Sequence, residues 1–466
     1  MTTRLAPRPD SRLGLAFCRS TVLSAILLVV LSISVTPASA EMCVLDNVPA
    51  ATLLLPYFEV DIESPDCIST LFSINNASSA PTIAHVTFWT DWSQPTLDFD
   101  LFLTGYDVQT INLRNVFVDA SLPRTADEQT DPLDTISPHG LNPAWDGSFD
   151  LAPNCANFFP FDNPVIQGPN LDRLVNGHTG QPVAAGGGLC LGHDHGDGHA
   201  RGYITIDDAN RCSLEFASDA GYFGGADPVA TNDNQLWGDF FIWDPGNDIA
   251  FGQPLVHIEA ADDFDASSTA TGATFYGRYT SPSGLDNREP LGTSWAVRYL
   301  NGGAFDGGTN LIVWRDSTID SDPNAFFECG VGPDWFPLNE TEVVAFDEQE
   351  DAVELCFDPG GGVVSPPIDP EDPACFPLET QWVPVGSGEL TPPWNFGWLF
   401  LNLNIDDMGI ANDVDFGSAG DIAQSWVGAV HTALGLYQVG FGAVQLTGAC
   451  QDVSPLLVPT WTIPQP

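Results

Sequence analysis

The chain has 466 residues, and its 62 acidic residues against 13 basic ones give a formal net charge of −49 at pH 7. All of the basic residues are arginine, so lysine is absent. Proteins that hold nucleic acid by its phosphates need Lys and Arg contacts, so this charge excludes nucleic acid as a partner. It also predicts strong self-repulsion unless cations screen or bind the surface.

The N-terminus has the pattern of a secretory signal peptide. Four arginines lie within the first 19 residues, residues 21–35 are apolar, and Ala38-Ser39-Ala40 has the small-x-small spacing of a cleavage site. The alternative is an uncleaved membrane anchor, but a bilayer-spanning helix needs about 20 apolar residues. We therefore expect a signal peptide over 1–40, cut after Ala40, and a secreted, extracellular or periplasmic protein with no membrane span in the mature chain.

The cysteines agree with export. Those beyond the signal segment are dispersed and contain no CxxC pair, which excludes a zinc ribbon and a thioredoxin-type redox motif. An exported chain with this usage is expected to form disulfides. Their connectivity stays open, and the pairs close in sequence are Cys43 with Cys67 and Cys190 with Cys212.

Strand-like periodicity runs through most of the mature chain. Between Leu97 and Leu103, apolar side chains alternate with Asp98 and Asp100, as on a strand with one apolar face. Further strands are predicted at 70–75, 83–90, 203–207, 255–259, 274–279, 295–300, 311–314, 343–346 and 398–403, with a hairpin at 425–446 that turns near Gly435. No amphipathic helix longer than two turns is expected. Short strands separated by Gly and Pro predict an all-β fold of immunoglobulin-like β-sandwiches with long Pro/Gly/Asp-rich loop insertions.

The same patterns divide the mature chain into regions. We expect a first β-sandwich region at 41–120, a loop-rich insertion at 121–200, a second β-rich region at 201–356, a Pro/Gly/acidic linker at 357–374, C-terminal strands at 375–452 and a tail at 453–466. The C-terminal strands either form a separate module or return to an earlier sheet. We favour the return, because these strands are too few to close a core alone.

Several sequence stretches resemble known proteins. The segment "VPAATLLLPYFEVD" and the following "TLFSINNASSAPTIAHVTFW" resemble the immunoglobulin-like sandwich modules of secreted bacterial proteins. Together with "GDGHARGYITIDDANRC", "DNREPLGTSWAVRYLNGG" and "LIVWRD", they are similar to a set of uncharacterised exported bacterial β-rich proteins. The resemblance implies a fold and a compartment, and it implies no activity, cofactor or catalytic residue.

A histidine-rich stretch precedes the strand predicted at 203–207, and it contains His193, Asp194, His195, Asp197 and His199. Imidazole nitrogens with a carboxylate suit zinc, copper or nickel, so this stretch is a candidate transition-metal site. The alternative is a polar loop outside any strand, with solvated imidazoles and with Arg201 paired to a neighbouring carboxylate. Ordering a glycine-rich loop around a metal costs conformational entropy, which favours the alternative.

Two acidic stretches are calcium candidates. Asp320, Asp322, Asn324 and Glu328 occupy positions one, three, five and nine of an EF-hand-like loop. The pattern then departs, because Ala325 stands where the turn needs glycine and Val331 where a bidentate glutamate is required. A second acidic loop contains Asp406, Asp407, Asp413 and Asp415. An ordinary solvated turn is the commoner role of either stretch, so calcium and a transition metal are candidate cofactors and neither is certain.

Catalytic motifs are absent from the sequence, including GxSxG, the P-loop, the dinucleotide GxGxxG and HExxH, so we assign no catalytic or cofactor-binding residue. Trp89, Trp92, Trp394 and Trp398 could stack on sugars, although core packing is the commoner role. We expect a secreted or cell-surface structural or interaction protein whose partners are cell-surface or extracellular proteins or glycans. The alternatives are an extracellular glycan- or metal-binding module and a secreted hydrolase.

Charge repulsion should make stability depend on salt, because folding brings many carboxylates together. We expect the melting temperature to rise with sodium chloride, which shortens the Debye length from about 30 Å at 0.01 M to about 3 Å at 1 M. Millimolar calcium at matched ionic strength should raise it further through binding to the folded state alone. Differential scanning calorimetry measures both effects, and a salt response without a calcium increment would identify the acidic loops as ordinary turns.

Overall fold

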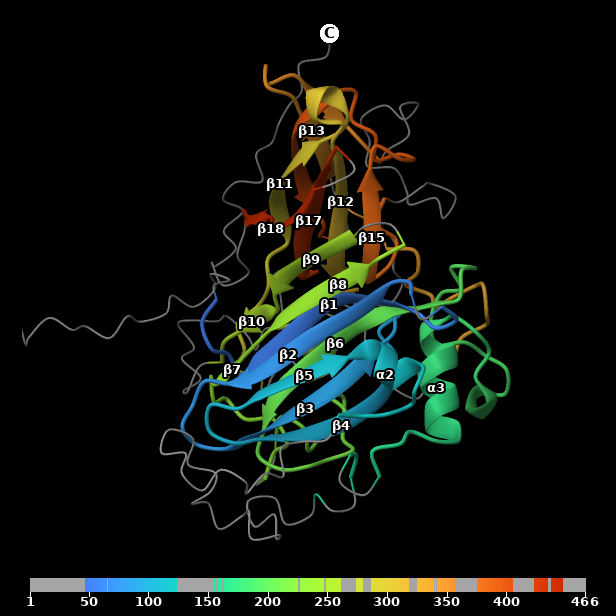
Figure 1. The fold of residues 1–466 in the computed structure, drawn as a ribbon, viewed down its shortest axis with the longest axis vertical. Helices are drawn as coiled ribbons and strands as arrows, with labels where there is room; N and C mark the ends of the chain where they lie inside the picture. Colours follow the sequence, from blue (N-terminus) through green and yellow to red (C-terminus); the bar gives the residue numbers. More distant parts are fainter. Residues whose placement is uncertain are drawn as a thin grey trace, which may run out of the picture. The chain divides into compact units, whose positions relative to one another are not determined.

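The computed structural model describes residues 47–64, 66–123, 155, 158–160, 163–224, 227–246, 249–260, 274–279, 286–317, 325–338, 340, 342–356, 375–404, 423–434 and 437–446. Within these residues the chain forms several antiparallel β-sheets and a few short helices (Figure 1). The predicted all-β class and sandwich architecture are therefore confirmed. The immunoglobulin-like family resemblance stays a prediction.

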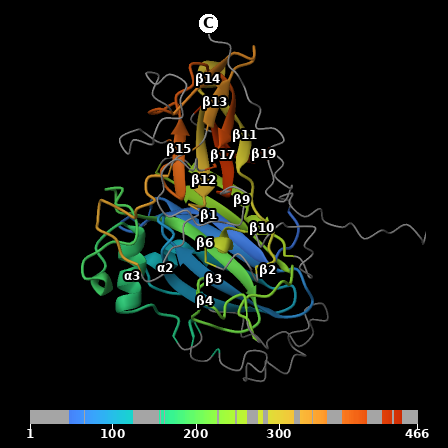
Figure 2. The same ribbon diagram turned by 180° about the vertical axis from the view of Figure 1, so that it is seen from behind.

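The first pair of sheets is built from the strands up to residue 258. One sheet has the order β10-β1-β6-β3-β4 (Figure 2), formed by β1 (Thr52–Asp61), β3 (Thr82–Trp89), β4 (Pro95–Leu103), β6 (His199–Ala209) and β10 (Val256–Ile258). The other has the order β5-β2-β8-β9, formed by β2 (Ser69–Asn76), β5 (Val108–Asn112), β8 (Asp239–Asp244) and β9 (Ile249–Pro254), and β7 (Leu236–Trp237) also pairs with β2. Thr70 of β2 donates a hydrogen bond to the carbonyl oxygen of Glu59 in β1, so the two sheets face each other there.

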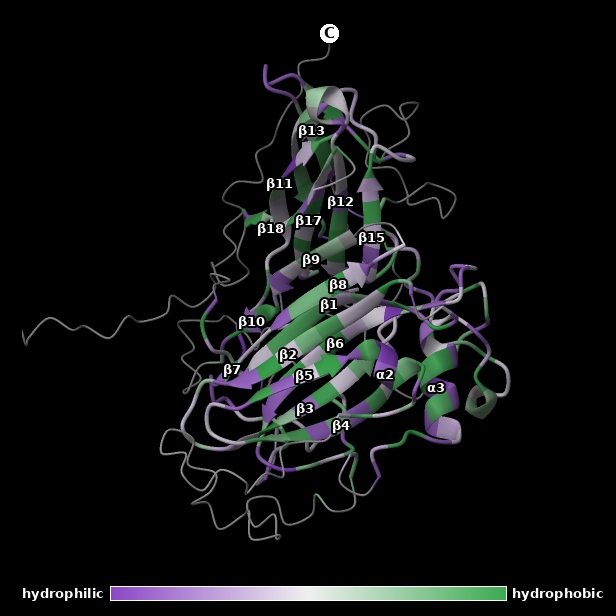
Figure 3. Cartoon of the chain, in the orientation of Figure 1, coloured by the Kyte–Doolittle hydropathy of each residue, from purple (hydrophilic) through white to green (hydrophobic). Residues whose placement is uncertain are grey.

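The second pair of sheets contains the remaining strands. One has the order β14-β13-β16-β11-β19, formed by β11 (Ser294–Leu300), β13 (Glu342–Phe346), β14 (Ala352–Glu354), β16 (Phe396–Asn402) and β19 (Val444–Gln445). The other has the order β15-β12-β17-β18, formed by β12 (Gly308–Arg315), β15 (Thr380–Val385), β17 (Ser425–Ala433) and β18 (Tyr437–Gly442). Strands from both sides of 357–374 share these sheets, because β16 lies between β13 and β11, and β15 and β17 flank β12. Figure 3 shows hydrophobic residues along the strands of both pairs, interspersed with hydrophilic positions.

Two sequence predictions are wrong where the structure has helices. The described helices are α2 (Leu113–Phe117), α3 (Pro169–His178), η4 (Ala184–Gly186), η5 (Phe275–Arg278) and η6 (Gly303–Phe305). The expectation of no helix longer than two turns is wrong, because α3 has ten residues and begins with proline in its first turn, where a missing N–H costs nothing. The strand predicted at 274–279 is also wrong: the Thr274 side chain accepts a hydrogen bond from the Tyr276 N–H and starts the 3₁₀-helix η5.

The other predicted strands are confirmed to within a few residues, and the hairpin corresponds to β17 and β18. The alternation rule does not single out β1, because all ten of its residues are buried and no polar face is left to detect.

The disulfides differ from the pairs close in sequence. The structure joins Cys155 to Cys212, Cys190 to Cys329 and Cys356 to Cys375, so a Cys190–Cys212 pair is wrong. Cys67 has a free thiol, whereas Cys43, Cys450 and the signal segment 1–40 lie outside the described residues. Three disulfides among the described residues indicate an oxidising extracellular or periplasmic environment. No helix among the described residues combines the length and apolar character that crossing a membrane requires.

A buried ionic cluster joins the two pairs of sheets. The Arg278 guanidinium, at the end of η5, donates hydrogen bonds of 3.1 Å to both carboxylate oxygens of Glu379, which immediately precedes β15. It also lies 3.2 Å from Asp316, just after β12, and the three side chains are 1%, 2% and 4% exposed. On the other side, η5 is tied to the first pair, because the Tyr276 hydroxyl donates to Asp207 of β6 at 2.7 Å.

Removing one charge from this cluster should destabilise the folded protein. We expect Glu379→Gln, which keeps the side-chain shape, to lower the free energy of unfolding by about 3 to 5 kcal/mol, because a buried cation then loses a partner. Glu389→Gln is the matched control at an exposed position and should change it by less than about 0.5 kcal/mol. Urea unfolding followed by tryptophan fluorescence measures both variants. Equal stability of the two variants would contradict the proposed role of Glu379.

Candidate functional site

The histidine-rich stretch is held against the rest of the fold. The Cys190–Cys329 disulfide fixes its beginning, and Cys190 and Phe327 exchange backbone hydrogen bonds of 2.8 and 2.9 Å. Gly180, just after α3, lies under the stretch so closely that a Cβ there would be 2.2 Å from the Asp194 nitrogen. The packing requires glycine at this position, whose φ of +68° also disfavours other residues.

His193 and His195 both lie against Asp91, which belongs to the turn between β3 and β4. The two oxygens of this buried carboxylate accept the His193 backbone N–H at 2.9 Å and the His195 Nε2–H at 3.0 Å. The two imidazoles meet edge to face, with ring centroids 4.8 Å apart, and His193 also contacts the Phe336 ring. Burial lowers the pKa of His193, which favours its neutral form.

His199 belongs to a different cluster, and the expectation that it lies outside any strand is wrong, because β6 begins with it. Its Nδ1 is 2.6 Å from Glu59 Oε1 of β1. The Arg201 guanidinium donates to the same Glu59 oxygen at 2.6 Å and to both Asp197 oxygens at 2.9 and 2.5 Å. Tyr57 donates its hydroxyl hydrogen to Glu59 Oε2 at 2.5 Å, so both oxygens of Glu59 are used. The predicted pairing of Arg201 with a neighbouring carboxylate is confirmed.

Glu59, Asp197 and His199 could in principle hold a metal ion, because one ligand atom from each lies within 4.8 Å of the others. The charges of the cluster argue against an ion there. Although burial opposes ionisation, the hydrogen bond from Arg201 lowers the pKa of Asp197 well below its usual range. The hydrogen bond to Glu59 raises the pKa of His199, which favours the imidazolium, and metal ligation requires neutral imidazole. Arg201 thus already supplies the positive charge, and the predicted transition-metal site stays a prediction.

The five residues of the predicted metal site are therefore distributed over two clusters. His199 and Asp197 meet around Glu59 and Arg201, whereas His193 and His195 meet at Asp91. Asp194 is exposed, and its side chain accepts the Gly196 N–H at 2.8 Å as in an ordinary turn. Glu59 and Asp91 were not identifiable from the sequence, because each lies more than 100 residues away from its histidine.

The calcium candidates are mostly outside the described residues. Asp320, Asp322 and Asn324 are not described, nor are the four aspartates of the loop at 406–415. Glu328 is described and exposed, and its carbonyl oxygen accepts the Val331 N–H at 3.1 Å. Calcium binding therefore stays a prediction.

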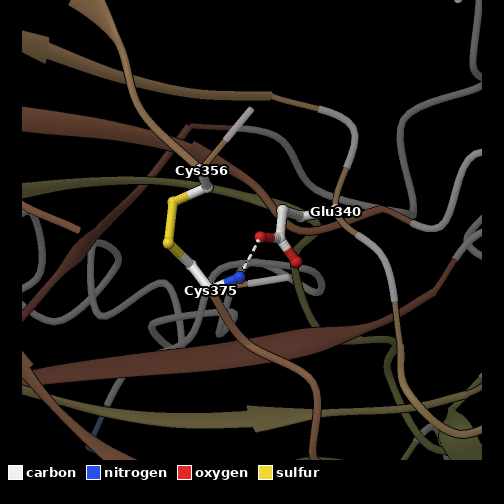
Figure 4. Close-up of side chains that lie close together, drawn as sticks. All are labelled: Glu340, Cys356 and Cys375. Carbon is white, nitrogen blue, oxygen red and sulfur yellow. Dashed lines mark hydrogen bonds between the residues drawn. A yellow bond between two sulfur atoms is a disulfide. The ribbon is translucent and has the colours of Figure 1, made fainter. Parts of the chain in front are cut away.

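A second group with metal-like spacing contains Glu340, Cys356 and Cys375 (Figure 4). The two cysteines form a disulfide, so neither sulfur is a thiolate ligand. Glu340 Oε1 accepts the Cys375 backbone N–H at 2.7 Å, and its other oxygen lies 3.5 Å from the Arg315 guanidinium. The group ties Cys356, Cys375 and Glu340 together and is a structural cluster.

A buried polar row that sequence reasoning did not find crosses the β10-β1-β6-β3-β4 sheet. The strand register aligns Thr52 of β1, Asp207 of β6, His85 of β3 and Asp100 of β4. His85 Nδ1 is 2.8 Å from Asp100 Oδ1, and both side chains are 0% exposed. Residues after β6 cover the row, because the Ser213 N–H donates to Asp100 at 3.1 Å and the Tyr222 ring packs edge-on against His85.

Two atoms beside this row are buried without a hydrogen-bond partner among the described residues: His85 Nε2 and Asp98 Oδ2. Burial raises the pKa of Asp98 to about 7. Burial opposes protonation of His85, but the charge of Asp100 raises its pKa to about 9. Because the described residues enclose these groups, the row acts as a buried, titratable part of the core.

Aromatic side chains define a different kind of surface on the outward face of β7 and β8. Trp237, Phe241 and Trp243 are 42%, 43% and 44% exposed. Trp89 and Trp92, which the sequence offers as sugar-stacking candidates, are buried in the core instead. Trp398 is 37% exposed, but its ring stacks on Phe346 with centroids 4.5 Å apart.

The buried row predicts a pH dependence of stability. Asp98 and His85 both have a raised pKa in the folded state, so their stabilising contribution is full below the unfolded values of about 4 and 6.5 and is lost as pH rises through about 7 and 9. We expect the free energy of unfolding in 1 M sodium chloride to decrease between pH 4 and pH 8. In Asp98→Asn, which mimics the protonated carboxyl, this decrease should be smaller by a few kcal/mol. The exposed Asp334→Asn is the control and should keep the wild-type slope. Parallel pH profiles for wild type and Asp98→Asn would disprove the assignment.

No family model, no curated protein and no solved structure matches the chain. Support for a function therefore has to come from the chemistry of its own surfaces.

Proposed function

We propose that this protein is a secreted interaction protein that associates with a second copy of itself through an uncharged surface near its C-terminal end. This surface, the apolar strip, consists of Leu434, Tyr437, Val439, Phe441, Val444 and Leu446. Each of these side chains is between 46% and 65% exposed. Apolar side chains left exposed along one short stretch of a chain are typical of protein interfaces.

The absence of charged residues from the segment that contains the apolar strip is the observation that carries the proposal. Residues 422–451 contain none of the 62 acidic and 13 basic residues of the chain. Elsewhere the surface is rich in carboxylates, which repel those of any other copy. The strip therefore offers two copies a surface to meet at without placing acidic side chains opposite each other.

The strand register supports the same surface. Val439 and Phe441 lie opposite His431 and Ala429 of β17, on one face of the sheet. That face points towards the opposing sheet, because His431 Nε2 donates to the Arg298 carbonyl oxygen of β11 at 2.8 Å. Tyr437, Val439 and Phe441 thus occupy core-facing positions at the edge of the sandwich and are nevertheless half exposed, so the described residues leave this part of the core uncovered.

A second copy fits this surface better than a basic partner does. A basic protein is attracted to carboxylates, and the apolar strip has none to offer. The strip of a second copy presents the same uncharged apolar side chains, and a twofold axis would pair each strip with itself. The disulfides, which suit an extracellular or periplasmic protein, support a role outside the cytoplasm.

The double variant Val439→Asp/Phe441→Asp tests the proposal. Burying side chains of this size stabilises by roughly 1.5 to 3 kcal/mol each, so the variant should weaken dimerisation at least about a hundredfold. Sedimentation velocity of the mature protein over a concentration series in 0.5 M sodium chloride should show a monomer–dimer equilibrium for wild type and monomer for the variant. Leu214→Asp, at another exposed apolar position, should dimerise like wild type. A wild-type protein that stays monomeric, or a double variant that dimerises equally, would overturn the proposal.

A further inference from the structure

The outward face of the β5-β2-β8-β9 sheet carries a straight row of aromatic rings. One unbroken register pairs β2 with β7 and β8, placing Asn75 opposite Trp237, Leu71 opposite Phe241 and Ser69 opposite Trp243. Residues 237, 239, 241 and 243 therefore project from the same face of an extended segment. At about 3.4 Å per residue, Trp243 and Phe241 are roughly 7 Å apart along the strand, and Phe241 and Trp237 are roughly 14 Å apart.

These rings are not part of the core. The alternate residues of β8, Phe240 and Ile242, face inwards and are 1% and 0% exposed. Trp237, Phe241 and Trp243 keep more than two fifths of their surface exposed, although large aromatic rings gain most from burial. Three such rings in line on a rigid sheet form a surface that is suited to bind a ligand.

The neighbouring strand β9 packs against the Phe241 ring. Gly252 lies opposite Phe241, and a Cβ added to Gly252 would be 3.0 Å from a ring carbon of Phe241. The ring therefore lies over the glycine backbone and presents its other side outwards. Ala250 and Pro254 lie opposite Trp243 and Asp239, so this side of the row contains only small or cyclic residues.

The strand on the other side, β2, supplies polar groups. Asp239 lies between Trp237 and Phe241, and its Oδ1 accepts the Ser73 hydroxyl at 3.0 Å. Ser73 in turn accepts from Asn75 Nδ2 at 3.0 Å, and the Ser69 hydroxyl donates to Asn112 at 3.1 Å. Asp239 is exposed, and its Oδ2 has no partner among the described residues, so it can accept a hydrogen bond from a ligand hydroxyl.

We infer that this face binds a neutral polysaccharide. Sugar rings present C–H groups on their faces and hydroxyls at their edges, which matches exposed aromatic rings beside the free carboxylate oxygen of Asp239. The row extends over several sugar units, so a chain suits it better than a single sugar. An anionic polysaccharide would need Arg or Lys to pair with its charges, and these positions of β2, β8 and β9 contain neither. The net charge of −49 also repels an anionic chain and leaves a neutral one unaffected.

Affinity electrophoresis of the mature protein in gels containing one soluble polysaccharide each tests the inference. The neutral probes are hydroxyethylcellulose, xylan, laminarin and galactomannan, and the anionic probes are alginate and polygalacturonate. We expect at least one neutral polymer to retard the protein and neither anionic polymer to do so. Trp243→Ala and Phe241→Ala should each raise the dissociation constant for that polymer about tenfold or more. Asp239→Asn should raise it less, because the amide still accepts a hydrogen bond.

Two control variants separate this inference from others. Trp398→Ala removes an exposed tryptophan from the other pair of sheets and should leave the affinity unchanged. Val439→Asp/Phe441→Asp should bind the polymer like wild type, so a failure of self-association and a failure of glycan binding are distinguishable. The inference is overturned if no neutral polymer binds, if alginate binds equally well, or if Trp243→Ala keeps wild-type affinity. It is also overturned if Trp243→Ala changes only the oligomeric state, since the row would then be a protein interface.

Discussion

The contact of the Arg278 guanidinium with Glu379 and Asp316 is a buried ionic connection between the two sheet pairs. It lies where η5, packed on the first pair, meets the segments that end β12 and precede β15. Buried charges are costly unless they are paired, and a guanidinium can satisfy two carboxylates with its planar set of donors. Arg288 and Arg315 are similarly buried, beside Asp207 and Glu340. Three of the few arginines of this chain thus lie inside the fold, each beside buried carboxylates.

Alternation in the sequence is sufficient to predict strands with one polar face, and it cannot show which polar faces are later covered. Asp98 and Asp100 alternate with apolar residues as they would on a solvated strand, yet both are buried, and Ser213 after β6 covers Asp100. Ser213 lies more than 100 positions further along the chain than Asp100. For the opposite reason β1 shows no alternation, because it is buried on both faces. The fold class was therefore predictable, whereas the buried polar row was not.

Sequence spacing is also a weak guide to the geometry of the histidine cluster. His193 and His199 are six residues apart, but β6 starts at His199, and an extended chain carries successive side chains to opposite faces. What each histidine contacts is decided by Asp91 and Glu59, which come from the β3–β4 turn and from β1. Only their positions in three dimensions reveal that one histidine contacts a glutamate and another an aspartate. The loop was predictable as a polar cluster, and its partners were not.

The acidic charge of the molecule acts differently on its two apolar surfaces. Two copies that meet at the apolar strip bring two net charges of −49 towards each other, so long-range repulsion opposes association and salt relieves it. A neutral sugar chain on the β8 face experiences no such repulsion, so the same salt leaves its affinity unchanged. The remaining acidic surface repels other acidic molecules, and it attracts basic molecules to itself and not to either apolar surface. In a protein this acidic, specific contacts are therefore expected where apolar side chains are exposed and carboxylates are few, and the described residues form such surfaces at β18 and around Asp239 on the outward face of β8.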